Sequence, residues 1–439
     1  MSNIILPYIK DEEEKGDNFF VKQELNVPIL VWWTPFTLDV GTYTSCGGKS
    51  EQCFLSNVRK YRANKDFEAF LFYGTDFRLH DLPLPRLPHE HWGLLHEESP
   101  KNSYLFSYED IMNLFNHSAT FKRNSDLPLT TQWLSSLEDL TDMKYFMSVK
   151  DKNRLQEEEN LSPVIYLQSD CNTPSDRDIY IEQLMKYIKI DSYGSCLHNR
   201  DLPDHLRDPI QAMEATEILK LVGKYKFALA FENAICTDYI TEKFWRPLKT
   251  GTIPVVFGSD KFNDFLPDNH SAISLLDYET PADLAHILHQ LNKNDTLYDS
   301  YREYKFKNIQ NSTLVYQTMI NRTWGIHNDR IKGNFINKFE CLVCERLYEN
   351  RRRKQHALTE YEYRSTLDHY GCPPPTTFDE NGSLLQNAGT WYQTYQFTKC
   401  QIDVFNMFIQ NKYYNFSEKE LFRESSKLFH PNFRRDDLF

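Results

Sequence analysis

Between residues 163 and 291, short apolar runs alternate with segments in which apolar side chains recur at helical spacing. The runs of strand length are 164–168, 226–231 and 253–257, and the helical segments are 179–190, 212–221, 242–249 and 281–291. Because parallel strands must be joined by crossovers, this alternation predicts an α/β domain with helices covering a parallel sheet. Ligands of such sheets bind beyond the carboxyl ends of the strands, so those loops are the first place to look for a site.

The remainder of the chain divides around this domain. Apolar runs at 29–33 and 67–72 predict further strands, residues 131–140 predict a helix, and the proline-rich segment 82–88 predicts an extended loop. A charged stretch that ends at Ser162-Pro163 indicates a domain boundary. The expected units are a polar leader (1–26), an N-terminal domain (27–160), the second α/β domain (161–345) and a polar, helical C-terminal extension (346–439).

Charge and hydropathy exclude several classes of protein. The chain has 50 basic and 62 acidic residues, a net charge of −12, whereas nucleic-acid binding needs clustered positive charge. No run approaches the roughly 18 apolar residues of a membrane span, and residues 1–22 lack the features of a signal peptide, so neither an anchor nor a signal peptide is expected. No G-x-G-x-x-G turn follows a predicted strand, which argues against a nicotinamide-dependent enzyme.

The segment from Phe231 to Pro247 combines a strand end, a polar loop and a helix start. Thr241 is a plausible N-cap, which places Glu242 and Lys243 in the first helical turn. A cation there opposes the helix dipole at a cost of roughly 0.3–1 kcal/mol, unless an anion occupies the helix N-terminus. The arrangement therefore predicts an anion site, with Glu242 suited to a sugar hydroxyl rather than to phosphate.

The segment 169–178 repeats this pattern after another predicted strand. Ser175 is the expected cap, and Arg177 follows in the first turn. Two basic residues at the starts of two helices predict a pyrophosphate clamp, although two ordinary helix starts with solvated cations would give the same pattern. Asp176 and Asp178 could chelate a metal, but acids are favoured in any first turn, so no metal site is expected.

Nine cysteines indicate a few structural bonds rather than a disulfide scaffold. Cys46 and Cys53 lie near the beginning of the expected folded region, and Cys341 and Cys344 lie near its end. Disulfides are favoured over a zinc site or a redox pair, because the spacing of the first two cysteines is loose for a zinc knuckle. The odd count leaves at least one thiol unpaired, for which Cys236 is our candidate.

Sequons for N-glycosylation agree with a secretory compartment. The chain has eight such sequons, and the one at Asn160 is doubtful because Pro163 follows its serine. The glycosylation candidates are Asn116, Asn269, Asn294, Asn311, Asn321, Asn381 and Asn415.

The donor-loop residues resemble a known family. Phe231-Glu-Asn233 and Asp238-Tyr-Ile-Thr-Glu-Lys243, followed by Gly251-Thr-Ile-Pro-Val-Val-Phe-Gly258, closely resemble the donor-site motif of glycosyltransferase family 10, the α-1,3-fucosyltransferases. The resemblance extends over about residues 28–345. Further stretches resemble one branch of this family, fucosyltransferases 10 and 11. That branch is also described as GDP-fucose protein O-fucosyltransferases of the endoplasmic reticulum. The stretches are 69–77, 96–102, 127–132 and 168–171.

The resemblance implies an α/β fold of the GT-B type, with two Rossmann-like domains facing across a cleft, and an inverting transferase that uses GDP-fucose without an essential metal or cofactor. By motif position, the residues expected at the nucleotide are Asn233, Tyr239, Glu242 and Lys243, with Arg177 at the pyrophosphate. Glu98 stands where the family has its general base, and the family's pairing implies Cys46–Cys341 and Cys53–Cys344. Two departures, Ala234 and Asp170, remove no charge needed at the phosphates.

Glu98 also fits the chemistry of a base. Inverting glycosyl transfer needs an acceptor hydroxyl that loses its proton as it attacks the anomeric carbon. Glu97 and Glu98 are adjacent, so on an extended backbone one can face the cleft, and clustered acids raise a pKa. The alternatives are a solvated loop at 96–98 and a metal cluster of His89, His91 and His96.

The acceptor is less constrained than the donor. The branch-like motifs favour Ser/Thr of a small, folded, cysteine-rich domain of the EMI type, and N-acetylglucosamine of an N-glycan is the alternative. A catalytically inactive protein that binds sugars or folding clients is a third reading, disfavoured because the charged motif residues are all present. The expected location is the lumen of the endoplasmic reticulum or the Golgi, with no nucleic-acid partner.

Overall fold

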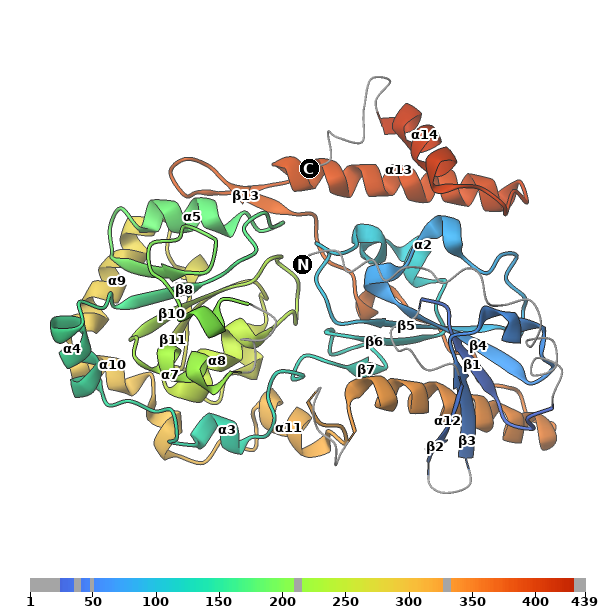
Figure 1. Ribbon diagram of the computed structural model, residues 1–439, viewed down its shortest axis with the longest axis horizontal. Helices are drawn as coiled ribbons and strands as arrows, with labels where there is room; N and C mark the ends of the chain where they lie inside the picture. Colours follow the sequence, from blue (N-terminus) through green and yellow to red (C-terminus); the bar gives the residue numbers. More distant parts are fainter. Residues whose placement is uncertain (1–23, 35–40, 48–50, 209–214, 327–332, 430–439) are drawn as a thin grey trace.

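The computed structural model describes residues 24–34, 41–47, 51–208, 215–326 and 333–429 (Figure 1). The expected polar leader therefore lies almost entirely outside the described residues. Two sheets, each covered by helices, lie side by side, and the C-terminal helices lie along one side of the first (Figure 1). This is the α/β architecture that the alternating periods predict.

The first sheet has seven strands in the order β2-β3-β1-β4-β5-β6-β7, and only β2 runs antiparallel to its neighbour. Its strands are β1 (Ile29–Trp32), β2 (Thr42–Cys46), β3 (Glu51–Ser56), β4 (Phe67–Tyr73), β5 (His91–His96), β6 (His117–Thr120) and β7 (Leu127–Pro128). One face packs against α12 (Phe335–Gln355), and the other packs against α2 (Glu109–Met112) and α13 (Thr390–Gln410). Both faces are therefore buried, as the continuous apolar runs require.

The second sheet has five parallel strands in the order β12-β11-β10-β8-β9. Its strands are β8 (Val164–Leu167), β9 (Ile190–Tyr193), β10 (Phe227–Phe231), β11 (Ile253–Phe257) and β12 (Ile273–Ser274). From β8 the chain goes first to β9 on one side and then returns to β10 on the other. The loops that follow β8 and β10 thus flank a topological switch point, the usual ligand position in open α/β sheets.

Helices cover both faces of the second sheet. Helices α5 (Arg177–Leu184) and α9 (Pro281–Lys293) pack on the side of Phe227, Leu229 and Phe231. Helix α8 (Glu242–Thr250) packs on the side of Ala230, and α7 (Thr216–Gly223) on that of Ala228. The remaining helices of this part are α3 (Glu138–Thr141), α4 (Val149–Glu158), α10 (Asp295–Ser300) and α11 (Leu314–Asn321).

The helix expected at 131–140 is mostly absent, since only the short α3 forms there. The carboxylate of Asp139 accepts a hydrogen bond from Ser135 N (3.1 Å), and Ser136 Oγ lies 3.5 Å from the same carboxylate. Such local side-chain bonds satisfy the backbone without a helical ladder.

Two of the three expected boundaries differ from the packing. Helix α4 lies before residue 160 but joins the second domain, where Asn153 Nδ2 donates to Asp295 Oδ1 (3.0 Å). The position after residue 345 falls inside α12, whose Glu340 accepts a hydrogen bond from Trp32 of the first sheet (2.8 Å). The charged stretch before Ser162 is a packed amphipathic helix rather than a linker, which its composition alone did not indicate.

Four disulfides join the described residues. Cys46–Cys341 and Cys53–Cys344 tie β2 and β3 to α12, which is the pairing that the resemblance implies. The other two are Cys171–Cys196 and Cys236–Cys372. Our expectation that Cys236 is unpaired is therefore wrong, and Cys400 is the free cysteine. The reason is tertiary, because a C-terminal segment returns to the loop after β10.

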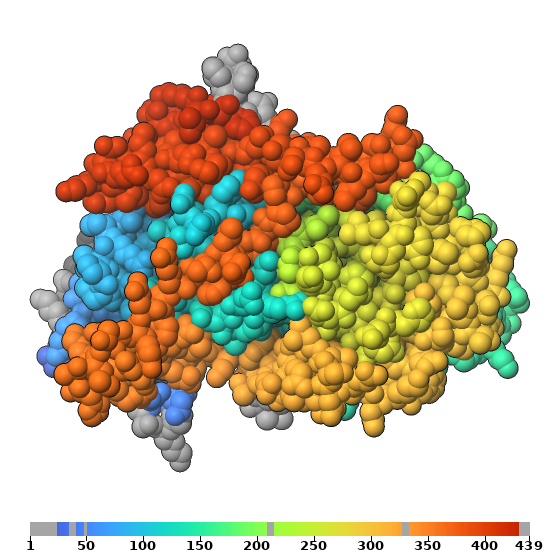
Figure 2. Space-filling view, turned by 180° about the vertical axis from the view of Figure 1, so that it is seen from behind, coloured from blue at the N-terminus to red at the C-terminus, as the bar shows by residue number. Residues whose placement is uncertain are grey.

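The C-terminal extension contacts both domains. After α12 it passes over the boundary between the domains, where Figure 2 shows it in orange. It then forms the hairpin of β13 (Thr376–Phe378) and β14 (Leu384–Gln386), followed by α13 and α14 (Glu418–Phe429). Phe378 packs in the core of the second domain and Phe405 in that of the first. The extension is thus part of the folded body rather than a solvated tail.

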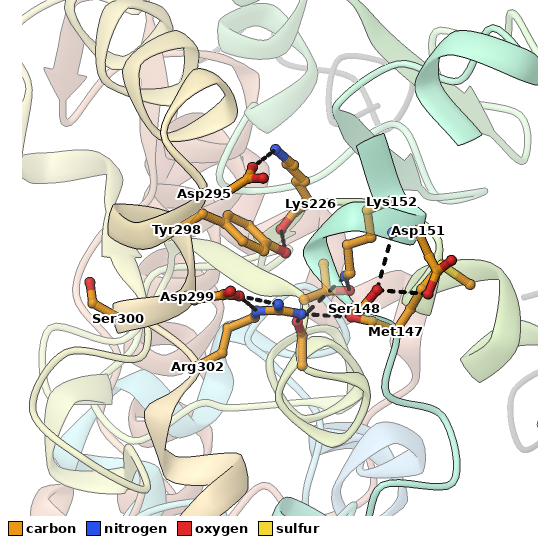
Figure 3. Close-up of polar contacts among 12 residues, drawn as sticks. Met147, Ser148, Asp151, Lys152, Lys226, Asp295, Tyr298, Asp299, Ser300 and Arg302 are labelled. Atoms are coloured by element: carbon orange, nitrogen blue, oxygen red, sulfur yellow. Dashed lines mark hydrogen bonds and ion pairs between the residues drawn. The ribbon is translucent and has the colours of Figure 1, made fainter. Parts of the chain in front are cut away.

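Three buried cations brace the amino-terminal edge of the second sheet (Figure 3). Lys152 Nζ donates to Tyr225 O (2.6 Å), and Lys226 Nζ donates to Asn292 O (2.7 Å). Arg302 Nη1 donates to Met147 O (2.9 Å). Burial and the neighbouring cations hold the pKa of Lys152 well below its usual range. Because these donors are used by the protein's own carbonyls, this edge does not present them to an anionic ligand.

We expect Lys152→Ala to lower the thermal midpoint by about 4 °C or more, because it removes a buried donor and opens a cavity worth about 2 kcal/mol. Lys150→Ala, an exposed change in the same helix, is the matched control and should leave the midpoint unchanged. Differential scanning calorimetry measures both. Equal midpoints for the two variants would contradict this role of Lys152.

Candidate active site

Loops from the carboxyl ends of both sheets meet between the domains. Lys101, after β5, forms an ion pair with Asp170, after β8. Arg123, after β6, forms an ion pair with Asp238, after β10 (2.6 Å). The Asp238 side chain is only 1% exposed, so the carboxylate of this second pair is withdrawn from water, whereas Arg123 is 33% exposed. The two edges that are expected to bind ligands therefore face each other.

Glu232 organises the loop that joins β10 to α8. Its Oε1 accepts hydrogen bonds from Thr241 N and Thr241 Oγ1, both at 2.8 Å. Thr241 caps α8 as predicted, since its hydroxyl accepts a hydrogen bond from Lys243 N (3.4 Å). A Cβ at Gly258 would lie 2.8 Å from Glu232 Cγ, so the glycine at the end of β11 makes room for this carboxylate.

Lys243 lies between two carboxylates at the start of α8. Its Nζ is 3.2 Å from Glu242 Oε1 and 3.5 Å from Glu232 Oε2, and 12% of its side chain is exposed. Burial lowers the pKa of Lys243, but the two carboxylates outweigh burial and hold it above its usual value. Burial likewise opposes ionisation of Glu242, yet Lys243 and Arg246 lower its pKa to about 2. The helix start thus carries a permanent ammonium beside an ionised carboxylate.

Arg177 is placed differently from the expected clamp. It is 1% exposed and donates to Phe231 O (2.7 Å), Asp170 O (2.8 Å) and Gln168 Oε1 (3.0 Å). Its guanidinium therefore ties the ends of β8 and β10 together from beneath the loops. Its charge opposes protonation of Lys243, but this effect is smaller than that of the two carboxylates, so the pKa of Lys243 stays above its usual value.

The cap of α5 is Asp176 rather than Ser175. Asp176 adopts the left-handed backbone conformation (φ +43°) and makes no side-chain cap bond. Ser175 Oγ instead donates to Glu232 O (2.7 Å), which links the two loops of the second domain. The expectation for Ser175 failed because its hydroxyl donates to a backbone oxygen distant in sequence, and α5 begins one residue later than expected.

Asn233 and Tyr239 lie on the same loop as Glu232. Asn233 Oδ1 is buried and has no hydrogen-bond partner among the described residues. Tyr239 is 3% exposed, and burial together with Glu98 and Glu232 raises its pKa well above the usual value. An unsatisfied amide oxygen beside a neutral phenol suits a polar ligand rich in hydroxyl groups.

Glu98 follows β5 and faces these groups from the first domain. Burial and the neighbouring Glu97 raise the pKa of Glu98 to about 7, and Lys243 partly opposes the rise. Burial also raises the pKa of Glu97, which accepts a hydrogen bond from Tyr73 Oη (3.1 Å). The carboxylate of one domain is thus electrostatically coupled to the ammonium of the other.

Three residues of this site were not predicted as site residues, namely Glu232, His96 and Tyr370. Glu232 is adjacent to the predicted donor residues, but its hydrogen bonds with Thr241 form only because the loop folds back on itself. His96 is fully buried and stacks on Tyr370, with ring centroids 5.2 Å apart. Tyr370 comes from the C-terminal extension, where the sequence pattern gave no signal beyond the nearby Cys372.

The histidines and acids considered as metal ligands do not converge. His91 Nδ1 lies 3.0 Å from His117 Nε2, whereas His96 is separately packed against Tyr370. Asp178 accepts a hydrogen bond from Tyr166 Oη (2.5 Å). Within the described ranges, the one group with metal-ligand proximity is Cys171, Asp178 and Cys196, and its two cysteines are joined in a disulfide.

Most sequon asparagines lie on the surface. Asn116 differs, because it is half-buried and its Nδ2 donates to Tyr363 O (3.0 Å). The exposed ones are Asn269, Asn294, Asn311, Asn321, Asn381 and Asn415.

Comparison with known proteins identifies the family of this chain. A fucosyltransferase N-terminal model matches residues 24–132, and a glycosyltransferase family 10 (fucosyltransferase) C-terminal model matches residues 157–361. GDP-fucose protein O-fucosyltransferase 3 of Gallus gallus is 45% identical over 375 residues, which cover 85% of this chain and 78% of that protein. The Homo sapiens protein of the same name is 41% identical over 90% of this chain and 81% of its own length. The chain therefore belongs to glycosyltransferase family 10.

Among solved structures, an α1,3-fucosyltransferase with GDP is 14% identical, with a TM-score of 0.42, over 74% of this chain and 93% of that one. The fold is of the GT-B type, with two α/β domains whose carboxyl edges are opposed. In the part of the chain that the structure describes, no helix is both long and apolar enough to cross a bilayer.

Proposed function

We propose that this chain is an inverting fucosyltransferase that transfers L-fucose from GDP-fucose to a Ser/Thr hydroxyl of a small, folded, cysteine-rich protein domain. The observation that carries the proposal is Glu98, a carboxyl group with a pKa of about 7 that faces the permanent cation Lys243 across the domain boundary. An acid–base group and an anion-binding group on opposite domains are what transfer from a nucleotide sugar requires.

The donor binds to the second domain in this proposal. Lys243 and the N–H groups at the start of α8 meet the diphosphate, while Arg177 adds positive charge from beneath the loops. The sugar hydroxyls exchange hydrogen bonds, as donors or as acceptors, with Glu242, Asn233 and Tyr239. Because cations of the protein meet the charge of the departing GDP, no metal ion is needed.

The chemical step is a single displacement. The acceptor oxygen attacks the anomeric carbon of fucose, the bond from that carbon to the phosphate oxygen breaks, and GDP leaves with the electron pair. Glu98 accepts the hydroxyl proton as the new bond forms. Lys243 stabilises the negative charge that develops on the leaving diphosphate. Attack opposite the leaving group inverts the anomeric carbon.

The relatives' names support a protein acceptor over a glycan. Four disulfides support an oxidising compartment such as the lumen of the endoplasmic reticulum or the Golgi. The six exposed sequons are candidate glycosylation sites there. N-acetylglucosamine of an N-glycan remains the alternative acceptor.

A direct competition tests the proposal. The full chain is given radiolabelled GDP-fucose with an EMI domain and an N-glycosylated peptide in the same reaction, and the products are separated by mass. Label on Ser/Thr of the EMI domain is the expected result. Label on the glycopeptide alone would show that the acceptor is an N-glycan rather than a protein hydroxyl. A chain that binds GDP but labels neither acceptor would favour the inactive protein that binds sugars or folding clients.

The pKa of Glu98 predicts the pH dependence of transfer. A base must be deprotonated to act, so kcat/KM should be high above pH 7 and fall with an apparent pKa of about 7 as the carboxyl group becomes protonated. Initial rates between about pH 5.5 and 9 at low GDP-fucose measure this limb. A rate that stays constant across that range would contradict Glu98 as the titrating base.

A further inference from the structure

The segment that follows the matched family models returns to the catalytic carboxyl group. The second family model ends at residue 361, and Tyr370 lies nine residues beyond it in the C-terminal extension. Tyr370 is fully buried, and its Oη donates a hydrogen bond to the backbone oxygen of Glu98 (3.0 Å). A residue outside the family core therefore contacts the backbone that carries the proposed base.

The ring of Tyr370 is held by the first domain. It stacks on His96 at an interplanar angle of 21° and meets Phe106 and Phe121 at centroid distances of 5.6 and 4.9 Å. Neither ring nitrogen of His96 has a hydrogen-bond partner among the described residues, so His96 serves as a flat packing surface. At Gly74 a Cβ would lie 2.4 Å from His96 Cγ, so the end of β4 has no room for a side chain there.

The backbone around Tyr370 is fixed at two further points. His369 Nδ1 lies 3.0 Å from Ser118 Oγ of β6. Cys372 is bonded to Cys236 on the loop between β10 and α8, the loop that also carries Tyr239. Tyr370 is thus anchored both to the first sheet and to the donor-side loop, and movement of either anchor would reach Glu98.

We propose that Tyr370 is a positioning residue for Glu98, by which the C-terminal extension completes the active site. This inference rests on the proposed function, in which Glu98 is the base. The hydroxyl group fixes the backbone oxygen of Glu98, so that the carboxyl group remains in line with the acceptor oxygen. Small displacements of a base lower the turnover rate without changing donor affinity.

Tyr370→Phe tests the inference, because it keeps the stacked ring and removes only the hydroxyl group. We expect kcat to fall about tenfold and its acid limb to move upward by about half a pH unit, since an oriented donor near Glu98 is lost. The KM for GDP-fucose and the Kd for GDP, the latter measured by calorimetry, should not change. Tyr363→Phe makes the same deletion on the same extension, away from Glu98, and should leave all four quantities unchanged.

The other outcomes separate the two proposals. If Glu98→Gln abolishes transfer while Tyr370→Phe keeps the wild-type kcat and acid limb, the positioning role is overturned and the function stands. If Tyr370→Phe lowers kcat but also weakens GDP binding or lowers the thermal midpoint, its role is structural. The inference is then also overturned. If Glu98→Gln transfers fucose normally, both proposals fail.

Discussion

Glu98→Gln should lower the rate of fucose transfer by about a thousandfold or more, which is the range expected when a general base is lost. The amide keeps the size of the side chain but cannot accept the acceptor proton. GDP should bind as tightly as before or slightly more tightly, because the negative charge facing Lys243 is removed. Single-turnover transfer assays and calorimetry with GDP measure the two quantities.

Glu109→Gln is the matched control, since Glu109 is an exposed glutamate of the same domain at the start of α2. It should leave both transfer and GDP binding unchanged. Equal transfer rates for Glu98→Gln and Glu109→Gln would remove Glu98 from the mechanism. The catalytic role would then have to pass to another group facing the donor loop.

Lys243→Ala should weaken GDP-fucose binding at least tenfold, or about 1.4 kcal/mol. Two effects add, because the variant loses the ammonium and also leaves Glu232 and Glu242 uncompensated beside the diphosphate. The loss in kcat/KM should exceed the loss in affinity, since charge on the leaving group is greatest in the transition state. Titration calorimetry and initial rates measure the two effects.

Lys261→Ala provides the comparison for Lys243→Ala. Lys261 is exposed and follows β11 at the same edge of the second sheet, so its removal causes the same change in net charge. It should alter GDP affinity by less than about twofold at physiological salt, because exposed charges are screened. Similar losses in both variants would indicate a general electrostatic effect in place of a specific clamp.

The fold was predictable where the sequence carries a clear period. The apolar runs of β8, β10 and β11 and the cap at Thr241 depend on neighbouring residues, and the structure has strands and a helix start at those positions. The order of strands then brings the two predicted loops together at the switch point, so the donor side of the site follows from local pattern and general topology.

Features that depend on distant contacts were not predictable in the same way. Arg177 has the spacing of an exposed helix-start cation, but the end of β10 offers it a backbone acceptor and the residue is buried. Cys236 and Tyr370 depend on the path of the C-terminal extension, whose polar composition resembles a solvated tail. Nothing within a few residues of either position indicates where that extension returns.

The pairing of β2 and β3 with α12 has a consequence for synthesis on the ribosome. Their cysteines are 295 and 291 residues apart, and the whole second sheet is encoded between them. The first sheet therefore emerges early with one apolar face uncovered and the other covered only in part, because α12 and α13 are both translated later. Domains generally fold as units in order of emergence. Here the later-made domain can mature first, and the earlier one is completed afterwards, when its two disulfides to α12 form.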